Sequence, residues 1–257
     1  MTRAFSMIDI PTRPVKPRQM GLTMMIDWGI PLTAQQDTLA LAGDFIDLAK
    51  IAVGISGLLS EEMLRAKLDA YRAAGVEPFP GGMYVELAHK QGKTDAYFAE
   101  CKRVGYSLVE ISDNVVHFSP ETRSRLIRQA VEDHGLRVLG EVGSKHVETD
   151  PATLVADIKG SLEAGAWKVF VEAAEFVVKG GFDTGLVEYI LSEVDASDIL
   201  FELPGHWIAD VHAHEIYRMM MWLVEHVGID VNIGNVASSE VIPLETLRTH
   251  VGVNMKL

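Results

Sequence analysis

The sequence predicts a single-domain α/β fold, a (β/α)8 TIM barrel, from three observations. Four glutamates lie inside short apolar runs, in VEIS (Glu110), GEVG (Glu141), VFVEAAE (Glu172) and FELP (Glu202). They are 31, 31 and 30 residues apart, which is about the length that a strand, a helix and two short connections require. Capped helical segments alternate with these runs. The chain has 257 residues, 48% of them apolar, and about 250 residues is typical of one such barrel.

Eight short apolar runs are the expected strands. Most of them are almost continuously apolar, as strands covered on both faces should be. They span residues 21–27, 46–53, 82–87, 107–112, 137–142, 168–173, 199–203 and 230–234. A doubly wound open sheet would share this alternation of strands and helices. No Gly-rich dinucleotide-binding motif follows the first run, so the closed barrel is favoured.

The helical segments between the runs carry start and stop signals. SEEMLRAKLDAYRAAG begins with Ser60 as the expected N-cap and ends at Gly75. SPETRSRLIRQAVEDHG repeats this pattern from Ser119, and DPATLVADIKGSLEAG repeats it from Asp150, each with proline at the first helical position. Three capped helices, each followed closely by an apolar run, predict repeated βα units.

The domain organisation is simple. No Ser/Gly tract, proline run or charge block interrupts the chain after residue 20, so residues 19–257 are expected to form one barrel domain. Residues 1–18 contain the basic, proline-rich stretch IPTRPVKPRQ and are expected to form an N-terminal arm in solvent. A contact of this arm with the active site or with a second subunit is the alternative.

Composition and charge exclude several classes of protein. The formal net charge of −13 makes nucleic acid an unexpected partner, because phosphate backbones require basic patches. A small anionic substrate stays compatible with a locally positive site. The single cysteine, Cys101, suits a reducing compartment, and neither a signal peptide nor a membrane-spanning apolar run is present. We therefore expect a cytoplasmic protein that does not enter membranes.

Polar side chains gather where the expected strands end, which is where barrel enzymes place their chemistry. These residues are Asp27, Lys50, Glu86, Glu110, Asp113, Glu141, Lys145, Glu172, Glu175, Glu202, Asn232 and Asn235. Several carboxylates at one mouth cannot all stay ionised without nearby positive charge. Lys50 and Lys145 supply part of it, and a divalent cation is expected to supply the rest. The alternative is that the glutamates pair with lysines as inner layers of the barrel.

The expected metal ligands are Glu141, Glu172 and Glu202. Because all of them offer oxygen, Mg²⁺ is favoured over Zn²⁺. HWIADVHAHE supplies His206, His212 and His214, which a zinc site could use, although helical geometry would point the last two to opposite sides.

Two glycine-containing segments remain. GGM at residues 81–83 is interpreted as a tight backbone feature beside a strand. IGNVASSE at residues 233–240 follows the last expected strand, a position where barrels often bind phosphate through backbone N–H groups.

Several motifs together resemble the phosphosulfolactate synthase family, in the same order and at similar spacing. They are KPRQMGLTMMIDWG, FIDLAKIAVG, GGMYVELAHKQGK, YFAECKRVGYSLVEISD, LGEVGSK and VNIGNVASSEVIPLETLR. The resemblance runs from about residue 16 to about residue 250. It implies a (β/α)8 barrel, a lyase that adds sulfite to phosphoenolpyruvate with Mg²⁺, and a homo-oligomer.

The resemblance also implies roles for individual residues. Lys145 in EVGSK is the expected general acid, and Glu110 and Glu141 are expected to assist catalysis or to hold the metal with Glu172. The residues expected to contact substrate are Lys50, Asn232, Gly234 and Asn235.

This chain departs from the family pattern at several of these segments. Ala174 stands where the family typically has an arginine, and GGM, AVGI and ELPGHW replace more polar versions. Loss of a bidentate guanidinium weakens anion binding. The substrate is therefore expected to be phosphoenolpyruvate or another, less charged enolate-forming acid. Two other classes stay open: a catalytically diverged barrel acting as a binding or stress-related protein, and a metal-dependent hydrolase that uses the histidines.

Overall fold

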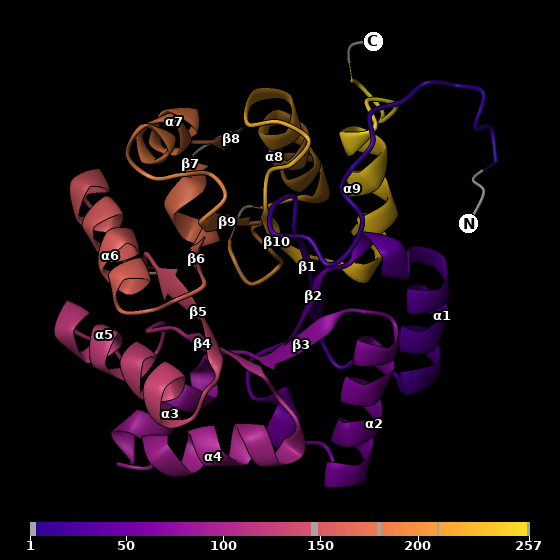
Figure 1. The fold of residues 1–257 in the computed structure, drawn as a ribbon. Helices are drawn as coiled ribbons and strands as arrows, with labels where there is room; N and C mark the ends of the chain where they lie inside the picture. The colour runs from indigo at the N-terminus through magenta and orange to yellow at the C-terminus, as the bar shows by residue number, and fades with distance from the viewer. Residues whose placement is uncertain (1–3, 145–148, 179–180, 210, 256–257) are drawn as a thin grey trace.

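A computed structural model describes residues 4–144, 149–178, 181–209 and 211–255. Eight parallel strands form a nearly closed barrel, and the helices surround it (Figure 1). The hydrogen-bonded order is β3-β2-β1-β10-β9-β6-β5-β4, so β3 and β4 are the two ends of the sheet. The predicted (β/α)8 barrel is confirmed.

The barrel strands are β1 (Thr23–Asp27), β2 (Leu48–Ile51), β3 (Glu77–Pro80), β4 (Leu108–Ile111), β5 (Arg137–Val142), β6 (Lys168–Val171), β9 (Ile199–Glu202) and β10 (Ile233–Val236). A small antiparallel hairpin, β7 (Val177–Val178) and β8 (Gly181–Phe182), lies outside the barrel sheet. The helices are α1 (Leu32–Ala42), α2 (Glu61–Ala73), α3 (Met83–Lys90), α4 (Thr94–Val104), α5 (Pro120–Arg128), α6 (Pro151–Glu163), α7 (Thr184–Glu193), α8 (Ala213–His226) and α9 (Val241–Arg248). None of these helices is both long and apolar enough to cross a membrane.

The third strand is not where the sequence placed it. Residues 82–87 belong largely to helix α3, and the strand is the preceding EPFP segment, Glu77–Pro80. Two prolines argue against a central strand, because proline cannot donate a ladder hydrogen bond. They are tolerated here because β3 ends the hydrogen-bonded sheet and pairs only with β2. The turn after β3 needs glycine, since a Cβ on Gly81 would lie 2.8 Å from the backbone nitrogen of Val53.

The three predicted helix caps are confirmed. The side chain of Ser60 accepts a hydrogen bond from the backbone N–H of Met63, and that of Ser119 accepts one from Thr122. Asp150 does the same for Thr153. Each cap satisfies one of the N–H groups that the first turn of a helix leaves without an internal partner, so these helices begin where the sequence indicates.

The interior of the barrel is filled by one apolar layer. Its residues come from the strands or from the positions just before them: Leu22, Met24, Leu48, Phe79, Leu108, Leu139, Phe170 and Leu200. All are almost completely buried. Because side chains alternate along a strand, the residues two positions after Leu48, Leu108, Leu139, Phe170 and Leu200 point to the same interior. Those residues are Lys50, Glu110, Glu141, Glu172 and Glu202, so a charged layer lies directly above the apolar one.

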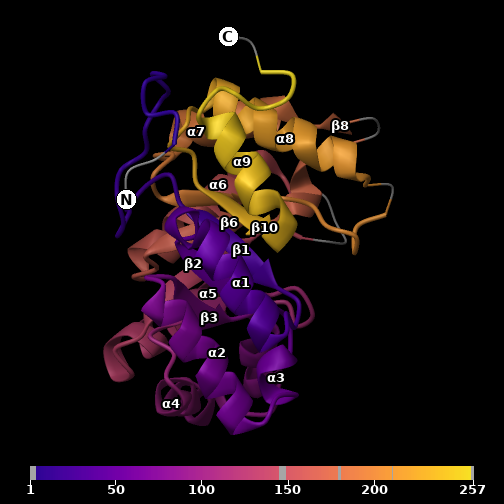
Figure 2. The same ribbon diagram turned by 90° about the vertical axis from the view of Figure 1, so that its right-hand side faces the viewer.

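The N-terminal arm is partly docked, which corrects the expectation of an arm in solvent. Lys16 donates to the backbone oxygens of Gly43, at 2.8 Å, and Ala74. Arg18 is buried and binds the carboxylate of Asp47 at 2.9 Å. The arm, indigo in Figure 2, therefore lies against the end of the barrel where the strands begin.

Candidate active site

The charged layer lies at the C-terminal ends of the strands. Lys50 is on β2, Glu110 on β4, Glu141 on β5 and Glu202 on β9, while Glu172 directly follows β6. All four glutamates are at most 2% exposed. Five of the charged side chains that the sequence predicted at the barrel mouth are thus brought together, from strands far apart in the chain.

Lys50 is the cation of this layer. Its Nζ lies 2.9 Å from Oε2 of Glu110, 3.3 Å from Oε1 of Glu202 and 3.7 Å from Oε2 of Glu141. Burial opposes the charged form of the lysine, but the three carboxylates outweigh it and raise the Lys50 pKa well above its ordinary value. Lys50 is therefore a fixed positive charge at neutral pH.

Glu110 faces the opposite balance. Burial raises its pKa well above the ordinary range, the attraction of Lys50 counteracts this in part, and Glu141 raises the pKa further through charge and a hydrogen bond. The backbone N–H of Gly82 also donates to Oε1 of Glu110, at 3.3 Å. Glu110 is thus held next to Lys50 and Glu141, and its carboxyl group binds a proton more readily than that of an exposed glutamate.

Three of the carboxylates have the geometry of a metal site. One oxygen from each of Glu141, Glu172 and Glu202 lies within 4.8 Å of the others. Because Mg²⁺ binds oxygen at about 2.1 Å, oxygens on opposite sides of one ion are roughly 4 Å apart. This donor set, all carboxylate oxygen in a buried mouth, fits a hard divalent cation. The trio is the one group of this kind within the described residues.

A cavity of about 580 Å³ opens above the charged layer. Lys50 and Glu202 line it, and apolar side chains form much of the rest of the lining. Asn235 also lines the cavity, in a left-handed conformation with φ of 55°. Its buried Oδ1 has no hydrogen-bond partner among the described residues. Ala174, at the position where the resemblance leads one to expect arginine, contributes only a methyl group.

The segment that contains Lys145 lies outside the described residues, so its expected role stays a prediction. The chain on either side of residues 145–148 is described. Glu175 accepts hydrogen bonds from the backbone N–H groups of Ser144, at 2.6 Å, and Thr149, at 3.1 Å. One buried carboxylate just after β6 therefore binds the residues on both sides of the undescribed segment.

Two of the residues expected to contact substrate, Asn232 and Gly234, instead contact other parts of the barrel. Asn232 is fully buried, accepts from the N–H of Leu22 and donates to the backbone oxygen of Ile199, near the starts of β1 and β9. It joins strands at the far end of the barrel and does not belong to the mouth cluster. Gly234 lies beside Glu202, where a Cβ would meet Met24 at 3.2 Å, so its role is close packing under the charged layer.

Three other carboxylates named from the sequence point away from the mouth. Asp27 binds Lys67 of helix α2, and Asp113 binds Arg123 of helix α5, each within 3 Å. Glu86, on helix α3 instead of a strand, accepts the backbone N–H groups of residues 114–116 and so shapes the loop after β4. These carboxylates stabilise the fold around the site.

The histidines do not assemble a site. His206, His212 and His214 are all exposed, and His212 is the N-cap of helix α8. Within the part of the chain that the structure describes, no metal-ligand cluster includes any of them. This placement gives the zinc hydrolase alternative no support.

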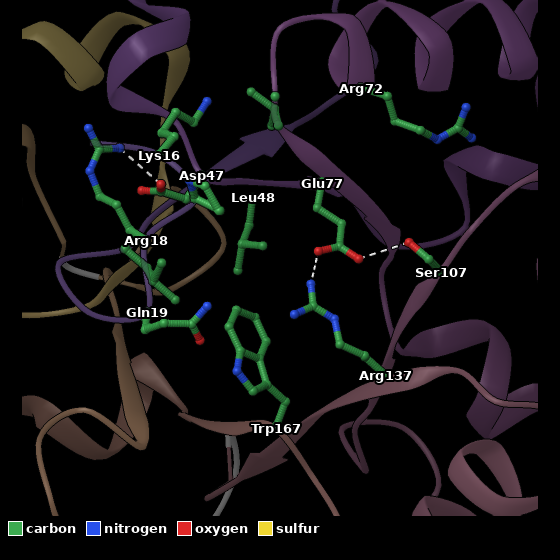
Figure 3. A pocket seen from close by; sticks show the side chains of 14 residues that line it. Lys16, Arg18, Gln19, Asp47, Leu48, Arg72, Glu77, Ser107, Arg137 and Trp167 are labelled. Carbon is green, nitrogen blue, oxygen red and sulfur yellow. Dashed lines mark hydrogen bonds and ion pairs between the residues drawn. The ribbon is translucent and has the colours of Figure 1, made fainter. Parts of the chain in front are cut away.

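A second cavity, of about 300 Å³, lies at the opposite end of the barrel (Figure 3). Its charged side chains already have partners in the protein: Arg137 pairs with Glu77, and Arg18 pairs with Asp47. The guanidinium carbon of Arg137 lies over Trp167, 4.2 Å from the centroid of the indole ring. This cavity is at the end where the strands begin, which in barrel proteins serves stability.

Sequence reasoning missed the wall of the mouth cavity. Trp28 follows β1 and Trp207 follows β9, and their ring centroids are 5.3 Å apart. Both line the cavity together with Val53. Their positions just after strands were the available signal, but an aromatic residue in a loop does not reveal which distant residue it will contact.

Comparison with known proteins agrees with this architecture. The sequence model of the (2R)-phospho-3-sulfolactate synthase (ComA) family matches residues 11–253. The phosphosulfolactate synthase of Methanothermobacter thermautotrophicus is 34% identical over 93% of this chain and 92% of its own length. That of Methanocaldococcus jannaschii is 32% identical over 90% and 91%.

More distant proteins are also similar. Protein HEAT-STRESS-ASSOCIATED 32 of Arabidopsis thaliana is 24% identical over 93% of this chain and 90% of its own. Among solved structures, 2,3-dimethylmalate lyase superposes with a TM-score of 0.53 at 14% identity, covering 91% of this chain and 86% of the other. That structural likeness concerns the fold.

Proposed function

The chain belongs to the phosphosulfolactate synthase family, a family of lyases, and we propose that it catalyses magnesium-dependent addition of sulfite to phosphoenolpyruvate or a related enolate-forming acid. The observation that carries this proposal is the charged layer at the barrel mouth. Glu141, Glu172 and Glu202 offer three buried oxygens within 4.8 Å, beside the ammonium of Lys50.

The reaction needs a site that stabilises negative charge and then delivers a proton. The sulfur lone pair of sulfite forms a bond to C3 of the enol acid, and the electrons of the C2–C3 double bond move toward C2 and the adjoining carboxylate. A proton then adds to C2, so the carbon–sulfur bond forms without any net oxidation or reduction. A bound Mg²⁺ supplies Lewis-acid stabilisation of that developing charge.

Side chains of the protein would bind the metal, stabilise charge on the substrate and supply the proton. Glu141, Glu172 and Glu202 would hold the cation, and the fixed charge of Lys50 stabilises negative charge that develops on the substrate. The amide oxygen of Asn235, which has no partner among the described residues, can accept a hydrogen bond from a donor group of the bound reactants. The proton at C2 is assigned to Lys145 on the family resemblance of EVGSK; Glu175 binds the described residues Ser144 and Thr149 on either side of that segment.

The proposal is tested by following phosphorus NMR of phosphoenolpyruvate with sulfite and Mg²⁺. We expect a new phosphate-ester signal that requires sulfite, requires the metal, and disappears in Lys145→Ala. Loss of one general acid lowers rates by about 10²–10⁴-fold. Glu193→Gln, an exposed carboxylate on helix α7, is the control and should keep full turnover.

Wild-type turnover in Lys145→Ala would remove the role assigned to that residue. Absence of product with phosphoenolpyruvate and with related enolate-forming acids, in a folded protein that binds Mg²⁺, would contradict the proposed reaction.

A further inference from the structure

The mouth cavity is lined by two chemically different groups of residues. The polar group, which we call the polar side, consists of Lys50, Glu202 and Asn235. The apolar group, which we call the apolar wall, consists of Ile26, Trp28, Ala52, Val53, Ala174, Trp207, Ile208 and Ala209. Both groups line the same cavity, so a molecule anchored at the polar side can also contact the wall.

One aromatic residue of the wall, Trp28, is unusually exposed. Trp28 is 42% exposed, although large aromatic side chains are usually well buried in a folded protein. Its ring centroid lies 5.3 Å from that of Trp207 and 5.5 Å from that of His206, so three rings from two loops meet at the rim. Exposed apolar groups gathered around a cavity typically mark a binding surface.

The loop after β9 is built to present Trp207. A Cβ on Gly205 would lie 2.1 Å from the indole ring, so only glycine lets the ring fold back over the chain. The absence of a side chain at residue 205 thus leaves room for the indole beside Trp28, with the two ring centroids 5.3 Å apart.

The wall carries no charge that would select a second anionic group. Of the described residues lining the cavity, Lys50 is the one cation, and it contacts Glu110, Glu141 and Glu202. Ala174 presents a methyl group on the wall. The polar side therefore suits one anionic head, and the wall suits a group without charge.

The space exceeds what a three-carbon acid fills. A volume of about 580 Å³ falls within the roughly 300–1,000 Å³ range of pockets that enclose drug-sized ligands. Val53 also lines a third cavity, of about 470 Å³, whose other lining includes Leu58, Met83 and Leu87. Apolar surface thus continues beyond the mouth cavity.

We propose that the substrate is a carboxylic acid that carries an apolar alkyl or aryl substituent, with its carboxylate end at the polar side and its substituent on the wall of Trp28, Trp207 and Ile208. This inference rests on the proposed function for the anchoring of the carboxylate end. It goes further by assigning the remaining volume to a chain or ring longer than that of phosphoenolpyruvate.

The test is the affinity of a homologous series of 2-oxo acids, from pyruvate to 2-oxohexanoate, measured calorimetrically with Mg²⁺ present. We expect the Kd to fall about fourfold for each added methylene, the factor that burial of one CH₂ group supplies. In the double variant Trp28→Ala/Trp207→Ala the change should shrink to less than twofold per methylene. Tyr189→Ala is the matched control, because Tyr189 is 39% exposed on helix α7 and does not line the mouth cavity, and it should keep the full slope.

A series with equal affinities, or the same slope in the double variant as in the wild type, overturns the inference. Phosphoenolpyruvate turnover with sulfite is measured separately on the same preparations. Turnover together with equal affinities would leave the proposed reaction standing and reject the substrate class. If affinity rises steeply along the series but neither phosphoenolpyruvate nor a related enolate-forming acid reacts with sulfite, the substrate class stands and the proposed reaction is rejected.

Discussion

Replacing Lys50 by methionine is expected to abolish turnover and to destabilise the fold by about 3–5 kcal/mol. The ammonium lies within 4 Å of carboxylate oxygens of Glu110, Glu141 and Glu202, all of them buried. Methionine keeps most of the side-chain shape but removes the charge. The substitution therefore removes the positive charge that three buried carboxylates share and increases the repulsion between them.

The sign of the pH dependence follows from the raised pKa of Lys50. A group whose pKa is higher in the folded than in the unfolded protein stabilises fully below its unfolded pKa, and this contribution is lost as the pH rises through the folded pKa. The difference between wild type and Lys50→Met should thus be complete at pH 7. Urea unfolding at that pH measures it.

Two comparisons make this result specific. Lys159→Met removes an exposed lysine that pairs with Glu193 at 3.0 Å, and such pairs contribute at most about 1 kcal/mol. Added Mg²⁺ should restore part of the stability of Lys50→Met, because a divalent cation at the carboxylates replaces the missing charge. Wild-type stability in Lys50→Met would mean that the layer does not depend on this cation.

The second large effect is expected for Asp27→Asn, which should destabilise the fold by about 3–5 kcal/mol. Asp27 is completely buried and accepts from Lys67 Nζ at 2.8 Å and from the hydroxyl of Tyr71 at 2.6 Å. Its other carboxylate atom, Oδ1, accepts the backbone N–H groups of Gly29 and Ile30. An amide removes the negative charge and points two N–H donors at groups that are themselves donors.

Urea unfolding measures this loss, and a double-mutant cycle with Lys67→Met separates its cause. If the unpaired ammonium of Lys67 is the main cost, Asp27→Asn/Lys67→Met should be less destabilised than the sum of the single variants. A loss below about 1 kcal/mol in Asp27→Asn would show that the buried pair contributes little.

Local signals in the sequence were sufficient for most of the fold. The N-caps Ser60, Ser119 and Asp150 act through hydrogen bonds within three residues, so a single stretch reveals them. The third strand was misplaced because apolar content favoured residues 82–87, whereas the position of β3 at the end of the sheet allows a strand with two prolines. That position is a property of the whole sheet.

The charged layer was predictable because one periodicity governs it. A glutamate two residues after an inward apolar residue must also face inward, as Leu108 and Glu110 illustrate. The cavity wall was not predictable, since Trp28 and Trp207 are far apart in the sequence and meet only when β1 and β9 flank β10. Asn232 was expected to contact substrate, but its side chain forms hydrogen bonds with backbone groups near the starts of β1 and β9. Its position in the sequence does not reveal these partners.

The most direct test of the central claim, that the carboxylates at the barrel mouth hold a catalytic divalent cation, is a Mn²⁺ titration followed by electron paramagnetic resonance, with Mg²⁺ as competitor. Wild type should bind one ion per chain, and Glu172→Gln should weaken binding at least about tenfold, in line with the loss that disturbing a metal site causes. Glu193→Gln, on the exposed face of helix α7, should bind as wild type does. No stoichiometric binding by the wild type, or equal affinity in Glu172→Gln, would contradict a metal site at Glu141, Glu172 and Glu202.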